Sequence, residues 1–125
     1  MKAAKSEIII AVVGVCASGK STLIAALTSR GYSCKHIAQE HSYVANMWKR
    51  LVNPDILIYL SARYETTLKR KKLNWTLAEY QEQVRRLDDA FQNAHIHINT
   101  DALTPAELVE ETEKQIRSLI NPSDP

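Results

Sequence analysis

Two stretches of the chain carry apolar residues almost without interruption, which predicts strands buried on both faces. They are residues 8–13, Ile-Ile-Ile-Ala-Val-Val, and residues 55–60, in which five apolar residues follow Asp55. Such strands are typical of the middle of a parallel sheet, where helices cover both faces. Residues 32–38 and 95–98 mix or alternate apolar and polar side chains, and we predict them as edge strands.

Helical periodicity occupies the segments between these strands. A stripe of Leu23, Ile24 and Leu27 predicts a helix from about Lys20 to Arg30, ended by Gly31. The next stripe predicts a helix that starts at Ser42, as N-cap, and runs to Asn53-Pro54. Its apolar residues, interpreted as core rather than as a ligand box, are Val44, Met47, Trp48 and Leu51.

Three more helices are predicted in the second half of the chain. The first covers residues 63–72, with Ser61 as its cap, and the second covers 76–93. The third covers 104–120 and has Pro105 at its first position. Capping boxes open the last two, Thr76-x-x-Glu79 and Thr104-x-x-Glu107. On the 76–93 helix, one face is predicted to hold Leu77, Tyr80, Val84, Leu87 and Phe91.

This alternation of strands and helices predicts an α/β fold of three layers. We expect an open parallel sheet of about four strands with helices on both faces. If the two apolar strands lie inside and crossovers are right-handed, the simplest strand order is 2-1-3-4. Ligands bind at the switch point of such a sheet, beyond the carboxyl ends of the strands. Residues 1–120 are predicted to form one domain, with 121–125 as a frayed tail.

Residues 14–22, Gly-Val-Cys-Ala-Ser-Gly-Lys-Ser-Thr, lie between the first strand and the first helix and fit the P-loop pattern G-x-x-x-x-G-K-[ST]. Glycines let the backbone curl with its N–H groups inward, and the helix start adds its positive dipole end. A tight strand-to-helix turn without a ligand is the alternative. The pattern favours ATP and Mg²⁺, with Lys20 on the β- and γ-phosphates and Ser21 on the metal. The predicted phosphate-binding residues are Gly14, Ala17, Ser18, Gly19, Lys20, Ser21 and Thr22.

Composition and charge narrow the possible partners. The chain of 125 residues has 16 Lys and Arg against 14 Asp and Glu, a balance too mild to favour nucleic acid. Its apolar runs are far shorter than a membrane span, and its first residues lack the apolar stretch of a signal peptide. We therefore expect a cytoplasmic protein that binds neither nucleic acid nor membrane.

The two cysteines, Cys16 and Cys34, fit no metal or disulfide framework, so reduced thiols are expected. Cys16 occupies a variable position of the loop. A catalytic thiol would need a base partner, and the sequence supplies none. We interpret Cys16 as a loop residue without a catalytic role.

The P-loop, together with the order of the elements after it, resembles the small P-loop kinases, a group that includes adenylate, dephospho-CoA, shikimate and gluconate kinases. The resemblance covers nearly the whole chain and implies transfer of the ATP γ-phosphate to a small metabolite or nucleotide. It also implies a mobile basic lid between the 63–72 and 76–93 helices. The loop at 95–103 is similar to the group's closing element, which usually lies against adenine.

Phosphoryl transfer needs positive charge around the moving phosphoryl group. The available cations are Lys69, Arg70, Lys71, Lys72, Arg85 and Arg86. Four consecutive cations on one helical turn cannot all face one site, so a solvated face accounts for some of them. The resemblance places lid arginines near Arg70, Arg85 and Arg86, for which we predict a catalytic role. An outward-facing pair is the alternative for Arg85 and Arg86.

P-loop enzymes normally end a neighbouring strand with a carboxylate that holds the metal's water shell or accepts the substrate proton. Asp55 lies at the wrong end of its strand for this task. Glu40 closes the second strand at the right end, and we predict that it ligates the metal or acts as general base. Alternatively, Glu40 merely starts the next helix. The adjacent His41 is a weaker candidate for substrate binding, with a structural role as the alternative.

The chain departs from the resembling kinases between its second and third strands, where they insert a substrate-binding segment or an extra strand. An acceptor site would have to come from residues 42–50, with or without a second subunit in a homodimer. Its candidate residues are Tyr43, Asn46, Trp48, Lys49 and Arg50. The acceptor and the oligomeric state stay open.

The motif and the resemblance leave two candidate functions. The first is an ATP-dependent kinase. The second is a nucleotide-binding module, or slow ATPase, that regulates a partner protein. A GTPase is third, because Asn99-Thr100-Asp101 lacks the lysine of the guanine-reading N-K-x-D element and no D-x-x-G switch follows a strand.

Overall fold

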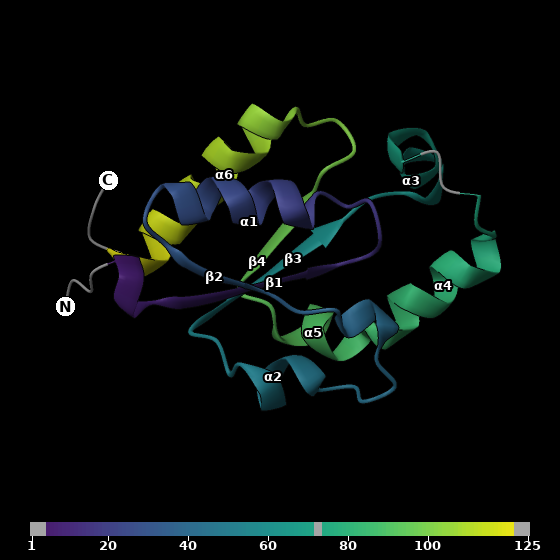
Figure 1. The fold of residues 1–125 in the computed structure, drawn as a ribbon, viewed down its shortest axis with the longest axis horizontal. Coiled ribbons are helices and arrows are strands. Elements are labelled where there is room, and N and C mark those ends of the chain that lie inside the picture. The colour runs from purple at the N-terminus through teal and green to yellow at the C-terminus, as the bar shows by residue number, and fades with distance from the viewer. Residues whose placement is uncertain (1–4, 72–73, 122–125) are drawn as a thin grey trace.

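The computed structural model describes residues 5–71 and 74–121 (Figure 1). Its centre is a parallel sheet of four strands in the order β2-β1-β3-β4, as the burial pattern of the sequence predicts. The inner strands are β1 (Ile9–Gly14) and β3 (Ile56–Ser61), and the edge strands are β2 (Ser33–His36) and β4 (Ile96–Asn99). The sheet reverses its winding beside β1, because β2 and β3 pair with opposite edges of that strand.

Helices connect and cover the strands. Short 3-10 turns occur at η1 (Lys5–Glu7) and η2 (Gln39–His41). The α-helices are α1 (Lys20–Ser29), α2 (Met47–Leu51), α3 (Tyr64–Lys71), α4 (Leu77–Arg86), α5 (Asp88–Asn93) and α6 (Pro105–Ile120). Both expected capping boxes are present, at Thr76–Glu79 and Thr104–Glu107.

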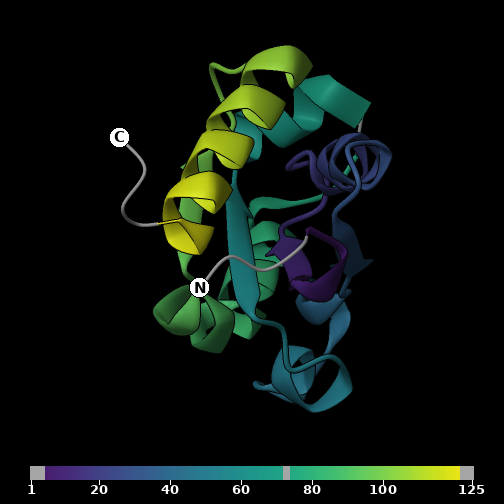
Figure 2. The same cartoon turned by 90° about the vertical axis from the view of Figure 1, so that its left-hand side faces the viewer.

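Apolar side chains form a separate core on each face of the sheet. Alternate residues of a strand point to opposite faces, so Ile10 and Val12 belong to one core and Ala11 and Val13 to the other. The first core lies under α1 and α6, and the second under α2 and α5 (Figures 1 and 2). The molecule therefore has the three layers expected from its sequence.

The helix predicted from Ser42 to Asn53 is mostly absent. Ser42 closes a turn with Val44 instead of capping a helix, and helical structure begins only at Met47. Trp48 is buried, as expected, but Val44 and Leu51 are exposed by 44% and 69%. The apparent stripe was misleading because half of it faces away from the sheet.

The helix predicted over residues 76–93 is interrupted at Leu87, which separates α4 from α5. Leu87 and Ala90 are fully buried against the sheet, whereas Leu77, Val84 and Phe91 are exposed by 39–49%. The predicted single apolar face is therefore wrong, since the chain turns at Leu87 to bring α5 under β3. Ser61 ends β3 and lies three residues before α3, so it is not the cap of that helix.

Some expectations fall wholly or partly on residues that are not described. Lys72, the last residue of the predicted 63–72 helix, lies outside the described residues, as do residues 122–125 of the predicted tail. Among the described residues, no helix combines the length and the apolar character needed to cross a bilayer.

Candidate functional site

The loop between β1 and α1, residues 14–19, lies at the carboxyl edge of the sheet and is called the glycine loop below. Its backbone takes positive φ at Ala17 (65°) and at Gly19 (109°), a conformation that glycine adopts without strain. Gly14 lies against β3: a Cβ there would stand 2.5 Å from the Leu60 carbonyl oxygen and 2.6 Å from Ser18 Oγ. The glycines are thus required by the curl of the loop and by its close packing.

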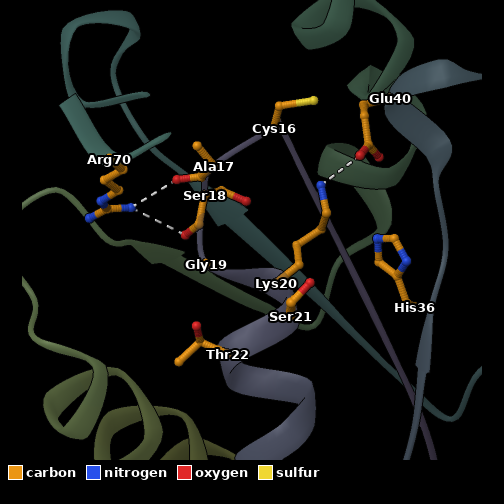
Figure 3. Close-up of a pocket in the computed structure, with 10 residues that line it drawn as sticks. All are labelled: Cys16, Ala17, Ser18, Gly19, Lys20, Ser21, Thr22, His36, Glu40 and Arg70. Carbon is orange, nitrogen blue, oxygen red and sulfur yellow. Dashed lines mark hydrogen bonds and ion pairs between the residues drawn. The ribbon is translucent and has the colours of Figure 1, made fainter. Parts of the chain in front are cut away.

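The glycine loop and the start of α1 line a pocket of about 340 Å³ (Figure 3). Gly19 is the N-cap of α1, and no side chain caps that end. The first N–H groups of a helix have no partner within the helix, and they carry the positive end of its dipole. The pocket is therefore suited to an anion. Its lining consists of Cys16, Ala17, Ser18, Gly19, Lys20, Ser21, Thr22, His36, Glu40 and Arg70.

Lys20 is the central charge of this pocket and is only 8% exposed. Its Nζ donates to Glu40 Oε2 at 2.7 Å, to the Gly14 carbonyl at 2.5 Å and to the Val15 carbonyl at 3.2 Å. An ammonium group has three donors, so all of them are used. Lys20 must give up at least one of these contacts before it can bind another anion.

Glu40 reaches the pocket from η2, just after β2, and points at Lys20 (Figure 3). The side chain is 4% exposed, and its Oε1 has no hydrogen-bond partner among the described residues. The hydroxyl of Ser18, another pocket residue, is buried and unpartnered in the same way. A buried carboxylate oxygen without a partner is costly, which marks this side of the pocket as a place for a further ligand.

The position of Glu40 depends on its neighbour Gln39, which is fully buried. The Gln39 side chain donates to the carbonyls of Val44 and Arg86 and accepts from the backbone N–H of Trp48. These contacts tie η2 to α2 and to the end of α4. The backbone of η2 that carries Glu40 is therefore fixed by contacts with α2 and α4.

Arg70 approaches the glycine loop from the side opposite Glu40 (Figure 3). It projects from α3 and donates to the carbonyls of Ala17 and Ser18 at 3.2 and 3.4 Å. It also donates to the hydroxyl and the carbonyl of Thr100, and the Thr100 hydroxyl donates to the Ser18 carbonyl at 2.7 Å. The structure thus brings Arg70 to the pocket, and Thr100 joins it to the end of β4.

A second pocket of about 300 Å³ adjoins the first and shares four of its residues, Ser18, Gly19, Thr22 and Arg70. Its remaining lining comes from the loop after β4 and the start of α6, and consists of Thr100, Leu103, Thr104, Pro105 and Leu108. The first pocket is charged beside Lys20, and the second is more apolar beside Leu103.

Arg85 and Arg86, the other two arginines predicted to be catalytic, are not among the residues that line either pocket. Arg85 is exposed and pairs with Glu82 on its own helix, as an outward-facing residue would. Arg86 also pairs with Glu82, stacks on the exposed ring of Tyr43 at 4.4 Å, and donates to the backbone carbonyl of Glu40 at 3.4 Å. Its contact with the site is therefore through the backbone of η2.

The side chains expected to bind an acceptor, in residues 42–50, do not gather in one place. Trp48 is buried, and its indole N–H donates to Asp89 at 2.8 Å, whereas Tyr43 is 88% exposed. Lys49 and Arg50 are exposed on α2, and Asn46 precedes that helix. None of these five residues lines the two pockets.

The region of the expected lid has its own aromatic cluster. The rings of Tyr64, Trp75 and Tyr80 lie 5.7–6.5 Å apart, and the Tyr64 hydroxyl donates to the Trp75 carbonyl. Tyr80 donates to the Ala62 carbonyl, and burial raises its pKa. The beginning of α4 is thus fixed against α3.

Four site residues were not identified as such from the sequence: Cys16, His36, Gln83 and Thr100. Gln83, from α4, accepts from the backbone N–H of Cys16 and donates to its Sγ at 3.2 Å. His36 lies in the predicted edge strand 32–38, whose mixed pattern indicates no role for it in a site. Spacing along the chain gives no signal for such contacts, which depend on how α4 and β2 pack beside the loop.

Neither the protein-family models nor the curated proteins that were compared with this sequence matched it.

Proposed function

We propose that the chain has a P-loop NTPase fold, binds ATP with Mg²⁺, and is a kinase that transfers the γ-phosphate to a small metabolite or nucleotide. The observation that carries this proposal is the convergence of Lys20, the uncapped start of α1 and Glu40 on one pocket. Positive charge and the N–H groups at a helix start suit a polyphosphate, and a carboxylate beside them suits the metal that accompanies it.

The residues present fit a hard divalent cation. Mg²⁺ prefers oxygen ligands, and Ser21 and Glu40 supply a hydroxyl and a carboxylate on the lining of the same pocket. The unpartnered Oε1 of Glu40 agrees with this assignment. When bound, the metal would neutralise charge on the β- and γ-phosphates.

Lys20 changes partners in this scheme. Without nucleotide, its ammonium is held by Glu40 and two loop carbonyls. A triphosphate with its cation offers Lys20 new acceptors and offers Glu40 a new positive partner. Both members of the buried pair therefore remain compensated, which a buried charge requires.

The apolar part of the site favours a nucleobase. Leu103, Pro105 and Leu108 line the second pocket beside the glycine loop. A base placed there would leave its phosphates directed at Lys20. The resemblance to small kinases also implies that the loop at 95–103, which includes Leu103, lies against adenine.

A kinase assay with an acceptor panel tests the proposal. Loss of γ-phosphate from Mg-ATP is measured with nucleotides, shikimate, gluconate and other hydroxylated metabolites. One acceptor is expected to raise turnover at least about a hundredfold over water, which corresponds to about 2.7 kcal/mol in barrier. Lys20→Ala and Glu40→Gln should both lose this turnover, whereas Lys114→Ala, an exposed lysine of α6, should keep it.

One observation favours a different function. The chain between β2 and β3 contains only η2 and the five-residue α2, and its candidate acceptor residues do not line the pockets. The alternative is therefore a regulatory module that binds ATP, or hydrolyses it slowly, and acts on a partner protein. Saturable ATP binding without stimulation by any acceptor would contradict the kinase and support this alternative.

A further inference from the structure

A cluster of three potential metal ligands lies at the edge of the glycine loop: Cys16, Glu40 and His41. One ligand atom from each residue can be chosen so that all three lie within 4.8 Å of one another. Cys16 Sγ is 3.9 Å from His41 Nε2, and His41 Nε2 is 3.9 Å from Glu40 Oε2. The three side chains come from the glycine loop and from η2, which the fold holds side by side.

These distances are close to those of a tetrahedral metal site. Ligand atoms around zinc stand about 3.3–3.6 Å apart when sulfur lies about 2.3 Å and nitrogen or oxygen about 2.0–2.2 Å from the ion. Closing the cluster on one ion requires movements of about 1 Å. Cys16 is half-buried, whereas the His41 side chain is 59% exposed, so His41 has room to rotate.

A second observation points independently to a ligand at this place. Glu40 is 3% exposed, yet its Oε1 has no hydrogen-bond partner among the described residues. Oε2, the oxygen that lies 3.9 Å from His41 Nε2, is already paired with Lys20, so Oε1 is the oxygen that the carboxylate would offer to a cation. One carboxylate can serve Lys20 and a metal at the same time through its two oxygens.

The surroundings of Cys16 also suit a ligated thiolate. Gln83 Nε2 donates to Cys16 Sγ at 3.2 Å, and Gln83 Oε1 accepts from the Cys16 backbone N–H at 3.0 Å. A hydrogen bond to sulfur stabilises its negative form, and partners of this kind orient the ligands of metal sites. Gln83 therefore fixes the thiol in the position that the cluster needs.

We propose that Cys16, Glu40 and His41 form a site for a soft divalent ion of the zinc class, with the fourth coordination position left to water or to a ligand of the pocket. Thiolate and imidazole favour zinc over magnesium or calcium, which prefer oxygen alone. The site goes beyond the proposed kinase function and does not depend on it. It shares Glu40 with the magnesium site proposed above, so zinc and Mg-ATP would compete for that carboxylate.

The test is a titration of the full, metal-free, reduced chain with Co²⁺ alone, without nucleotide. Cobalt bound to a thiolate absorbs in the near ultraviolet, and zinc added afterwards should remove this absorption. We expect one ion per chain. Cys16→Ser should abolish the thiolate band, and the control Cys34→Ser, a half-buried cysteine of β2, should keep it.

His41→Ala is the most informative variant because His41 is exposed and its loss should not disturb the fold. This variant and Glu40→Gln should each weaken zinc binding at least tenfold. The proposal is overturned if Co²⁺ produces no thiolate band, if the band survives in Cys16→Ser, or if His41→Ala weakens zinc binding less than tenfold. Because no nucleotide is present, these results do not depend on whether the chain binds ATP.

Discussion

At the scale of single residues, the site is organised by the ion pair between Lys20 and Glu40. Both side chains are nearly inaccessible to solvent, and their charged atoms lie 2.7 Å apart. A buried charge that loses its partner is strongly destabilising, so each residue depends on the other when no ligand is bound. If the pocket binds a nucleotide, as proposed above, Glu40 would repel its phosphates and Lys20 would attract them.

Glu40→Gln should therefore distinguish the binding of the metal from the binding of the nucleotide. Without Mg²⁺, in EDTA, the substitution removes a negative charge beside the phosphates, and we expect ATP to bind about fivefold more tightly, or about 1 kcal/mol. With Mg²⁺ present, the gain in affinity that the metal gives should be largely lost. Fluorescence titration with a labelled ATP analogue measures both constants. Equal Mg²⁺ dependence in the variant and the natural chain would show that Glu40 does not hold the metal.

At the scale of elements, the position of η2, which carries Glu40, is set by contacts between segments distant in the sequence. Gln39 connects η2 with Val44, with the start of α2 and with the end of α4. On the other side of the glycine loop, Arg70 joins α3 to the loop and Thr100 joins the end of β4 to it. The glycine loop is thus held from both sides.

Gln39→Ala should destabilise the protein because it leaves the buried backbone N–H of Trp48 without its partner. We expect the free energy of unfolding to fall by about 2 to 3 kcal/mol, measured by urea denaturation. Gln92→Ala, at an exposed position of α5, should change it by less than about 0.5 kcal/mol. Similar losses in the two variants would mean that η2 is not held by Gln39.

At the scale of the whole molecule, the two ends of the described chain meet beside α1. Glu113 of α6 is 7% exposed and pairs with Arg30 at 2.6 Å and with Lys5 at 3.6 Å. Burial raises the pKa of this carboxyl group, but hydrogen bonds from Arg30 and Tyr32 outweigh that effect and bring the pKa below its ordinary value of 4.5. The ionised form of Glu113 therefore stabilises the fold.

This pairing predicts a dependence of stability on pH. A group whose pKa is lower in the folded state contributes fully above its ordinary pKa and loses that contribution as the pH falls through the folded value. At pH 7, the free energy of unfolding of Glu113→Gln should be lower than that of the natural chain by about 1 to 3 kcal/mol. Between pH 7 and pH 3, the natural chain should lose more of its free energy of unfolding than Glu113→Gln does. Urea denaturation at several pH values measures the difference, and parallel curves would contradict the assignment.

The sheet could be predicted from the sequence because burial on two faces leaves a clear pattern in residues 8–13 and 55–60, and the order β2-β1-β3-β4 follows from it. The helix at 42–53 could not, because Val44 and Leu51 have the right spacing but no layer to pack against. In the site, the motif placed Lys20 and Ser21 on the pocket, and Glu40 followed from the end of its strand. Gln83 is 67 residues from Cys16 and His41 is 25 residues away, so only the packed fold brings them together.

Direct binding of Mg-ATP tests the central claim, that the pocket at the start of α1 is a nucleotide site. By isothermal titration calorimetry, the natural chain and Lys114→Ala should bind one Mg-ATP per chain with similar affinity, and Lys20→Ala should bind at least tenfold more weakly, a loss of about 1.4 kcal/mol. Absence of saturable binding by the natural chain at millimolar Mg-ATP, or equal affinity in Lys20→Ala, would contradict the account.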